Sequence, residues 1–190
     1  MLVTAGGGED GYALMSTYVE AAVELSRKFS TRSLMVAGPE LAPAQATALH
    51  EAAQRRGNIR VVEFTDDMLS YMNAADVVVS MAGYNTICEL LTLRKRAVIV
   101  PRVKPVQEQK IRAERMAELS VFQMIHPDHL SPRALASAVG DQIQALRVDK
   151  EVPAVIDLGA LPRITEILSG VAVPDGCGTF IPALEPLWAS

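Results

Sequence analysis

The sequence has 190 residues, of which 49% are hydrophobic and 21% charged, and it carries a net charge of −4 at pH 7. This length and composition predict a globular domain with its own core and exclude a disordered or fibrous chain. The negative net charge does not favour binding to nucleic acid, and no apolar run reaches the ~20 residues of a membrane span. The two cysteines lack metal-ligand spacing and are too few for a disulfide framework. We therefore expect a reduced, cytoplasmic protein that needs no metal or cofactor.

Short apolar runs recur along the first two thirds of the chain and predict about six strands. Continuous runs of Val, Ile and Leu are typical of strands that are buried on both faces, as in a parallel sheet. The runs cover residues 2–5, 33–38, 59–64, 76–81, 97–101 and 121–125.

Amphipathic stretches between these runs predict helices over residues 12–29, 43–57, 106–119 and 131–146, with another that begins near Asn85 or Thr86. Ser131 is the expected N-cap of the helix that follows it, with Pro132 at its first position. The alternation predicts an α/β fold, a Rossmann-like doubly wound parallel sheet in a three-layer α/β/α sandwich.

A last helix is expected over residues 161–168. The stretch that follows it contains three prolines and no clear periodicity. We therefore expect one ligand-binding domain over residues 1–170 and an irregular tail over residues 171–190.

In an open parallel sheet, ligands bind beyond the carboxyl ends of the strands. The first unusual loop at that edge is "TAGGGEDG", residues 4–11. Consecutive glycines such as Gly7 and Gly8 allow a close approach of backbone amides to a ligand. The loop lacks the Lys-Ser/Thr of a P-loop, and a tight structural turn explains the glycines alone equally well.

The second loop is "AGYNT", residues 82–86, which leads from an apolar run into a helix. The free amides of a helix N-terminus attract a diphosphate. Glu89 follows, and a carboxylate can accept hydrogen bonds from a ribose diol. The spacing Thr86-x-x-Glu89 also fits a capping box, so the two roles remain open here.

The third loop, "VPRVKPVQEQK", brings Glu108 and Gln109 to the start of a helix. A carboxylate beside an amide offers the acceptors and donors that sugar hydroxyls need. By itself, such a pair is more often a solvated helix face.

Together, "EFTDDM", "ADVVVS", "AGYNT" with Glu89 three residues on, and "VP" followed by "EQ" keep a recognisable order and spacing. In these motifs residues 2–146 resemble the C-terminal, donor-binding domain of GT-B glycosyltransferases. The resemblance is to glycosyltransferase family 28, which includes the bacterial enzyme that adds N-acetylglucosamine to form lipid II. The loop "RVKPV" and the longer "GGGED" depart from the family pattern.

The resemblance implies a nucleotide diphosphate sugar, with UDP as the expected nucleotide, and assigns roles by position. Phe64, Thr65 and Met68 would hold the base, and Glu89 would bind the ribose. The diphosphate would lie against Gly83, Tyr84, Asn85 and Thr86. Glu108 and Gln109 would contact the sugar, and Gly7 and Gly8 would line the side of the cleft that faces the acceptor.

The resemblance also implies a missing N-terminal domain or subunit that holds the acceptor and the general base. We therefore expect no catalytic residue in this chain and no sugar transfer by it alone. Either the chain is a piece of a two-domain enzyme, which its abrupt start favours, or it is a natural single-domain subunit that pairs with a membrane-anchored acceptor subunit. The full enzyme could associate peripherally with a membrane. Alternatives are a nucleotide-sugar hydrolase or 2-epimerase of the same fold, a regulatory module that only binds a nucleotide, and an α/β domain whose glycine loops are structural.

Overall fold

The structure is a computed structural model that describes residues 1–148, 152–153, 156 and 159–171. Its contacts divide the chain into two compact units, Met1–Val155 and Ile156–Ser190. The expected tail lies outside the described residues apart from residue 171, which ends a helix.

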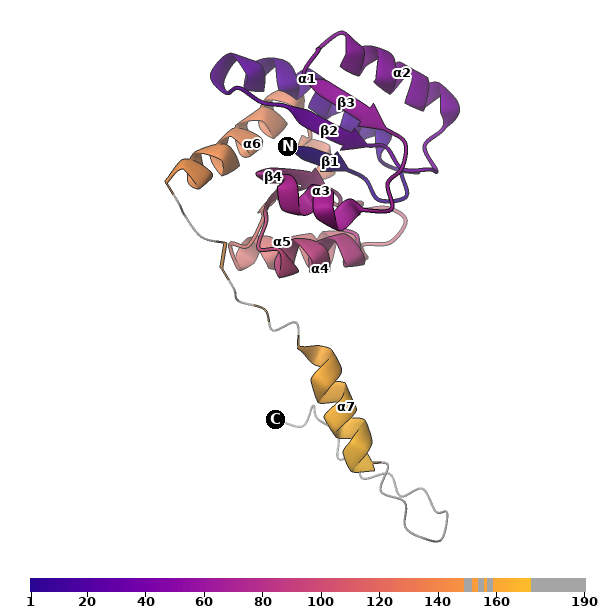
Figure 1. Ribbon diagram of the computed structural model, residues 1–190, viewed down its shortest axis with the longest axis vertical. Helices are drawn as coiled ribbons and strands as arrows, with labels where there is room; N and C mark the ends of the chain where they lie inside the picture. Colours follow the sequence, from indigo (N-terminus) through magenta and orange to yellow (C-terminus); the bar gives the residue numbers. More distant parts are fainter. Residues whose placement is uncertain (149–151, 154–155, 157–158, 172–190) are drawn as a thin grey trace. The chain divides into compact units, whose positions relative to one another are not determined.

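The larger unit contains a parallel sheet of six strands in the order β3-β2-β1-β4-β5-β6 (Figure 1). Val3 in the central strand pairs with Met35 on one side and Val79 on the other. The predicted doubly wound sheet is confirmed, and its winding reverses between β1 and β4. The strands are β1 Leu2–Thr4, β2 Ser33–Val36, β3 Ile59–Val62, β4 Val77–Ser80, β5 Arg96–Ile99 and β6 Gln123–Met124.

Six helices of this unit form two layers, one on each face of the sheet (Figure 1). Helices α1, α2 and α6 pack on one face, and α3, α4 and α5 pack on the other. Their bounds are α1 Tyr12–Lys28, α2 Pro43–Gln54, α3 Met68–Ala74, α4 Tyr84–Thr92, α5 Glu108–Glu118 and α6 Pro132–Arg147, with a 3₁₀ turn at Pro127–His129 before α6.

Local sequence explains most of these helices. The apolar stripe of α1 is buried as predicted and includes Leu14, Tyr18 and Leu25. Ser131 caps α6 by accepting a hydrogen bond from the amide of Ala134, and Pro132 is its first residue, also as predicted. Helix α3 was not predicted; it has seven residues, and the side chain of Asp67 caps it by accepting a hydrogen bond from the amide of Ser70.

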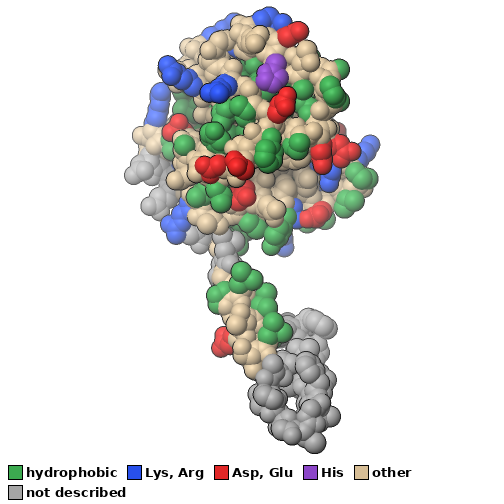
Figure 2. Space-filling model, turned by 45° about the vertical axis from the view of Figure 1, so that its right-hand side comes forward, with side chains coloured by type: hydrophobic (Ala, Val, Ile, Leu, Met, Phe, Trp, Pro, Cys, Tyr) green, Lys and Arg blue, Asp and Glu red, His purple; other side chains and the backbone are tan. Residues whose placement is uncertain are grey.

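The smaller unit contains α7, Ala160–Val171, which is longer than the expected helix over residues 161–168. Hydrophobic side chains lie exposed along this helix (Figure 2). They are Leu161, Ile164, Ile167 and Leu168.

Candidate functional site

The start of α4 lies at the point where the winding of the sheet reverses. Gly83 is its N-cap and has no side chain to cap the helix, so the amides of Tyr84, Asn85 and Thr86 lack an intrahelical acceptor. The helix starts at Tyr84, one residue before the earlier of the two predicted starts. Glu89 is consequently in the middle of the helix, which excludes the capping-box alternative.

A cleft of about 170 Å³ opens beside this helix start, at the carboxyl edge of β1 and β4. Ser80, the last residue of β4, lines the cleft and is 1% exposed. Its hydroxyl oxygen is buried without a hydrogen-bond partner among the described residues. A buried, unsatisfied hydroxyl is unfavourable, so it marks a place where a polar ligand would be stabilised. The cleft is lined by Ala5, Gly6, Gly7, Gly8, Glu9, Asp10, Glu40, Ser80, Met81, Gly83, Thr86, Arg102 and Gln109.

The glycine loop forms one wall of this cleft, and it also packs tightly against the loop after β2. A Cβ atom on Gly7 would lie 2.6 Å from Glu40 Oε2, and one on Gly8 would lie 2.6 Å from the carbonyl oxygen of Ala37. The amide of Glu40 donates a hydrogen bond of 2.8 Å to the carbonyl of Gly7. Loop packing thus accounts for part of the glycine requirement, as the structural alternative proposed.

The glycine-loop end of the cleft is acidic. Glu9, Asp10 and Glu40 line it together with a single cation, Arg102. Arg102 Nη1 donates a hydrogen bond of 2.9 Å to Asp10 Oδ2, and its Nε is buried with no partner in the described segments. The carboxylates repel phosphate, so this end suits a ligand rich in hydroxyl groups better than a diphosphate.

Gln109 joins this wall to the loop after β5. Its Oε1 accepts a hydrogen bond of 3.2 Å from the amide of Arg102, and its side chain lines the cleft. Glu108 does not line the cleft and is well exposed. The structure therefore brings one residue of the predicted sugar-binding pair to the cleft and leaves the other beside it.

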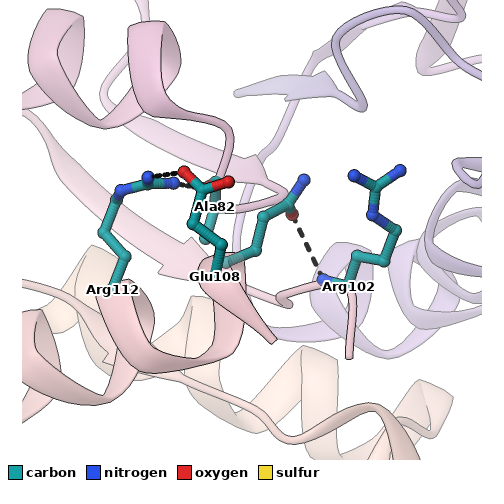
Figure 3. Close-up of polar contacts among 5 residues, drawn as sticks. Ala82, Arg102, Glu108 and Arg112 are labelled. Carbon is teal, nitrogen blue, oxygen red and sulfur yellow. Dashed lines mark hydrogen bonds and ion pairs between the residues drawn. The ribbon is translucent and has the colours of Figure 1, made fainter. Parts of the chain in front are cut away.

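A second cation, Arg112, lies on the side of Glu108 away from Arg102 (Figure 3). Arg112 Nη1 donates a hydrogen bond of 2.7 Å to the carbonyl of Ala82, and Nη2 is paired with Glu108. The guanidinium carbon lies 5.3 Å from the centre of the Tyr84 ring, within reach of a cation–π interaction. Sequence reasoning missed Arg112 and Arg102, because nothing local connects either residue to the start of α4 or to the glycine loop.

Glu89 is half-buried in α4, and its carboxylate forms no hydrogen bond or ion pair within the described part of the chain. Burial raises the pKa of its carboxyl group. The residue does not line the cleft, so the ribose role implied by the resemblance stays a prediction.

The residues expected to hold the base follow β3, at the same sheet edge. Phe64 is 66% exposed, and Thr65 Oγ1 accepts a hydrogen bond of 3.1 Å from the amide of Asp67. Met68 begins α3 and packs against the core on that face. The structure does not bring these three residues into the lining of the cleft.

The described residues contain neither a metal-binding cluster nor a membrane span. No three His, Cys, Asp or Glu side chains in that part of the chain are grouped to hold a metal ion. None of the helices described has the length and apolar character that a membrane span requires.

The face drawn in Figure 2 carries hydrophobic and acidic side chains across its middle, with Lys and Arg mostly toward its rim.

Comparison with known families decides the classification. The family model for the glycosyltransferase family 28 C-terminal domain matches residues 2–152, most of the chain. The chain belongs to this family. The match begins in β1 and includes all six strands of the sheet, so the cleft lies wholly inside the family 28 domain.

A curated relative is similar to this chain over most of its length. The UDP-N-acetylglucosamine--N-acetylmuramyl-(pentapeptide) pyrophosphoryl-undecaprenol N-acetylglucosamine transferase of Mannheimia succiniciproducens is 25% identical over 170 residues. That alignment covers 88% of this chain and 47% of the relative. The chain therefore spans about half the length of the curated relatives that it matches.

Two solved structures share the fold. The crystal structure of MurG from Acinetobacter baumannii superposes with a TM-score of 0.71 at 19% identity, over 89% of this chain and 49% of that one. The solution structure of ALG13 superposes with a TM-score of 0.56 at 18% identity, over 88% of this chain and 93% of that one. The family 28 relatives are glycosyltransferases, and this chain is the C-terminal domain of that family.

Proposed function

We propose that the chain is the donor-binding part of a glycosyltransferase and binds a nucleotide diphosphate sugar, with UDP as the nucleotide. The observation that carries the proposal is the start of α4 at the switch point of the sheet. The helix begins there without a side-chain cap, its residues Gly83 and Thr86 line the cleft, and so does Ser80, whose buried hydroxyl has no partner among the described residues. Free amides at a helix N-terminus are donors for a diphosphate.

The resemblance to the family supports the remaining roles, together with the charges that line the cleft. The diphosphate lies against Gly83, Tyr84, Asn85 and Thr86, away from the acidic wall. The sugar points toward Gln109 and the carboxylates of the glycine loop, which accept hydrogen bonds from its hydroxyls.

The nucleoside extends the other way along α4. Glu89 accepts hydrogen bonds from the ribose, and the base lies at the end of β3 near Phe64, Thr65 and Met68. UDP is the expected nucleotide because the curated relative from Mannheimia is named for a UDP-sugar donor.

The acceptor half of the site is proposed to come from outside the described residues. Binding the diphosphate stabilises the leaving group, a large part of catalysis, but it does not position or deprotonate an acceptor. The chain therefore binds the donor without transferring its sugar, and it requires an acceptor domain or subunit that faces Gly7 and Gly8. The expected cytoplasmic location stays a prediction.

Calorimetric titration of the chain with UDP, UDP-N-acetylglucosamine, GDP, dTDP, ADP and uridine tests the proposal. We expect selective binding of the uridine diphosphates, and Ser80→Ala weakens UDP about fivefold, the equivalent of one hydrogen bond of ~1 kcal/mol. The same variant leaves uridine affinity unchanged.

The hydroxyl of Ser80 has no partner among the residues that the structure describes, so its removal does not lower the free energy of unfolding. Absence of nucleotide binding at millimolar concentration would refute the proposed function for this chain.

A further inference from the structure

The two stretches that depart from the family pattern meet at the cleft. Asp10 belongs to "GGGED" after β1, and Arg102 belongs to "RVKPV" after β5. Arg102 Nη1 lies 2.9 Å from Asp10 Oδ2, and both side chains line the cleft. This ion pair joins two loops whose residues are 92 positions apart in the sequence. The two departures therefore form one feature of the cleft.

The guanidinium of Arg102 has unused hydrogen-bond donors. It carries five N–H groups, and the bond to Asp10 is the one that these groups make within the described part of the chain. The Nε is buried without a partner among those residues, which is unfavourable, so stability alone does not explain this position of the side chain. A ligand in the cleft would meet the guanidinium at its outer nitrogen Nη2.

The neighbouring amide offers a donor to the same ligand. Gln109 Oε1 accepts a hydrogen bond of 3.2 Å from the backbone amide of Arg102 (Figure 3). The Nε2 of Gln109, which donates, is left for a ligand in the cleft that this side chain lines. The carboxylate of Asp10 has further acceptor positions beyond the one that Arg102 occupies. Donors and an acceptor in one wall suit sugar hydroxyls, because each hydroxyl both donates and accepts.

The charges decide against a phosphate at this end of the cleft. Glu9 and Glu40 line the same wall as Asp10, and Arg102 is the one cation among the described residues of the lining. Asp10 balances that cation, so the other two carboxylates are uncompensated. They repel a phosphate, whereas neutral hydroxyls meet no such repulsion.

We propose that Asp10 and Arg102 form a specificity-determining pair for the donor sugar, in which Arg102 Nη2 donates to one sugar hydroxyl and the Asp10 carboxylate accepts from another. This inference rests on the proposed function and deepens it, since it adds two residues to which the family resemblance assigns no role. The pair does not contact the diphosphate. Its removal therefore lowers the affinity for a UDP-sugar and leaves the affinity for UDP unchanged.

Calorimetric titrations of the full chain with UDP, UDP-N-acetylglucosamine and UDP-glucose test the inference. Arg102→Met weakens the UDP-sugar that the unmodified chain binds more tightly by about fivefold, the equivalent of one hydrogen bond, and leaves UDP within about twofold. Asp10→Asn keeps an acceptor oxygen but loses the charge, and it weakens the same UDP-sugar about threefold.

Arg102→Lys separates a sugar contact from a structural tie between the loops. Lysine places a single nitrogen beside Asp10 and none at the position of Nη2, so we expect this variant to lose UDP-sugar affinity as Arg102→Met does. A structural tie needs only the cation, and lysine would then restore the affinity.

The matched controls are Lys110→Met and Glu114→Gln. These residues form an ion pair on α5, also of 2.9 Å and of similar exposure, and neither lines the cleft. The control variants change the affinities for UDP and the UDP-sugar by less than about twofold. A midpoint of urea unfolding measured for each variant separates loss of binding from loss of folding.

The other possible results are distinguishable. UDP-sugar affinity restored by Arg102→Lys makes the pair a tie between two loops and overturns the inference. Equal weakening of UDP and the UDP-sugar by Arg102→Met makes Arg102 a diphosphate contact and also overturns it, as does an unchanged UDP-sugar affinity. If the unmodified chain binds UDP but neither UDP-sugar, the inference fails alone. If the unmodified chain binds no nucleotide, the proposed function and the inference both fail.

Discussion

Glu89→Gln separates binding from stability more sharply than any other change in the site. The carboxylate of Glu89 is half-buried on α4 and has no hydrogen bond or ion pair to a described residue. The substitution therefore removes a charge without removing a native contact. If the carboxylate serves the ribose, the variant loses ligand affinity and keeps its fold.

The expected loss of affinity follows from the hydrogen bonds that the carboxylate makes to the ribose diol. A hydrogen bond to a charged group contributes about 1.5–3 kcal/mol, and the amide retains one acceptor oxygen. We expect a net loss near 1.4 kcal/mol, or about tenfold in the dissociation constant of UDP.

The expected change in stability has the opposite sign. Burial raises the pKa of Glu89, so the folded chain binds this proton more tightly than the unfolded chain. The stability contributed by the protonated group is complete at acidic pH and is lost as the pH rises through the raised pKa. At pH 7 the ionised carboxylate therefore lowers the free energy of unfolding, and Glu89→Gln raises it slightly.

The assay is calorimetric titration with UDP and with 2′-deoxy-UDP, together with urea unfolding at pH 4 and pH 7. The unmodified chain prefers UDP, and the variant loses that preference. Glu20→Gln, an exposed carboxylate on α1 across the sheet, serves as the control and changes neither quantity. A variant that binds UDP as tightly as the unmodified chain would refute the ribose role of Glu89.

Two further predictions concern the scaffold of the cleft. Gly38→Ala introduces a Cβ that overlaps the carbonyl oxygens of Gly6 and Gly7 at a φ of +89°, and it should cost at least about 2 kcal/mol in urea unfolding and weaken UDP binding. Gly57→Ala, at a φ of +73° with open space around it, should cost only about 1 kcal/mol, and equal costs would contradict the packing argument. Tyr18→Phe leaves the buried hydroxyl of Ser33 without its 2.8 Å partner and should cost about 1–2 kcal/mol. Burial also raises the pKa of Tyr18 to about 12, so the unmodified chain should lose stability as the pH rises from about 10 to about 12. An alkaline unfolding curve unchanged by Tyr18→Phe would contradict this assignment.

The sequence by itself predicted the six strands, their parallel arrangement and most of the helices. Burial on both faces leaves continuous apolar runs such as 76–81, and a one-sided helix leaves a stripe such as that of Leu14 and Tyr18 in α1. These patterns are local, and a cap such as Ser131 is visible within three residues of the amide that it satisfies. The helix α3 was missed because seven residues are too few for a periodic signal.

Tertiary structure decided which charges meet at the site. Asp10 and Arg102 are 92 positions apart and come together only because the ends of β1 and β5 lie at one sheet edge. Arg112 contacts the carbonyl of Ala82, 30 positions earlier, for the same reason. The i,i+4 spacing of Glu108 and Arg112 is readable in the sequence, but the start of α4 beside them is not. A chain can encode its local pairings in a few residues, whereas the position of a cation beside a helix end depends on the packing of the whole sheet.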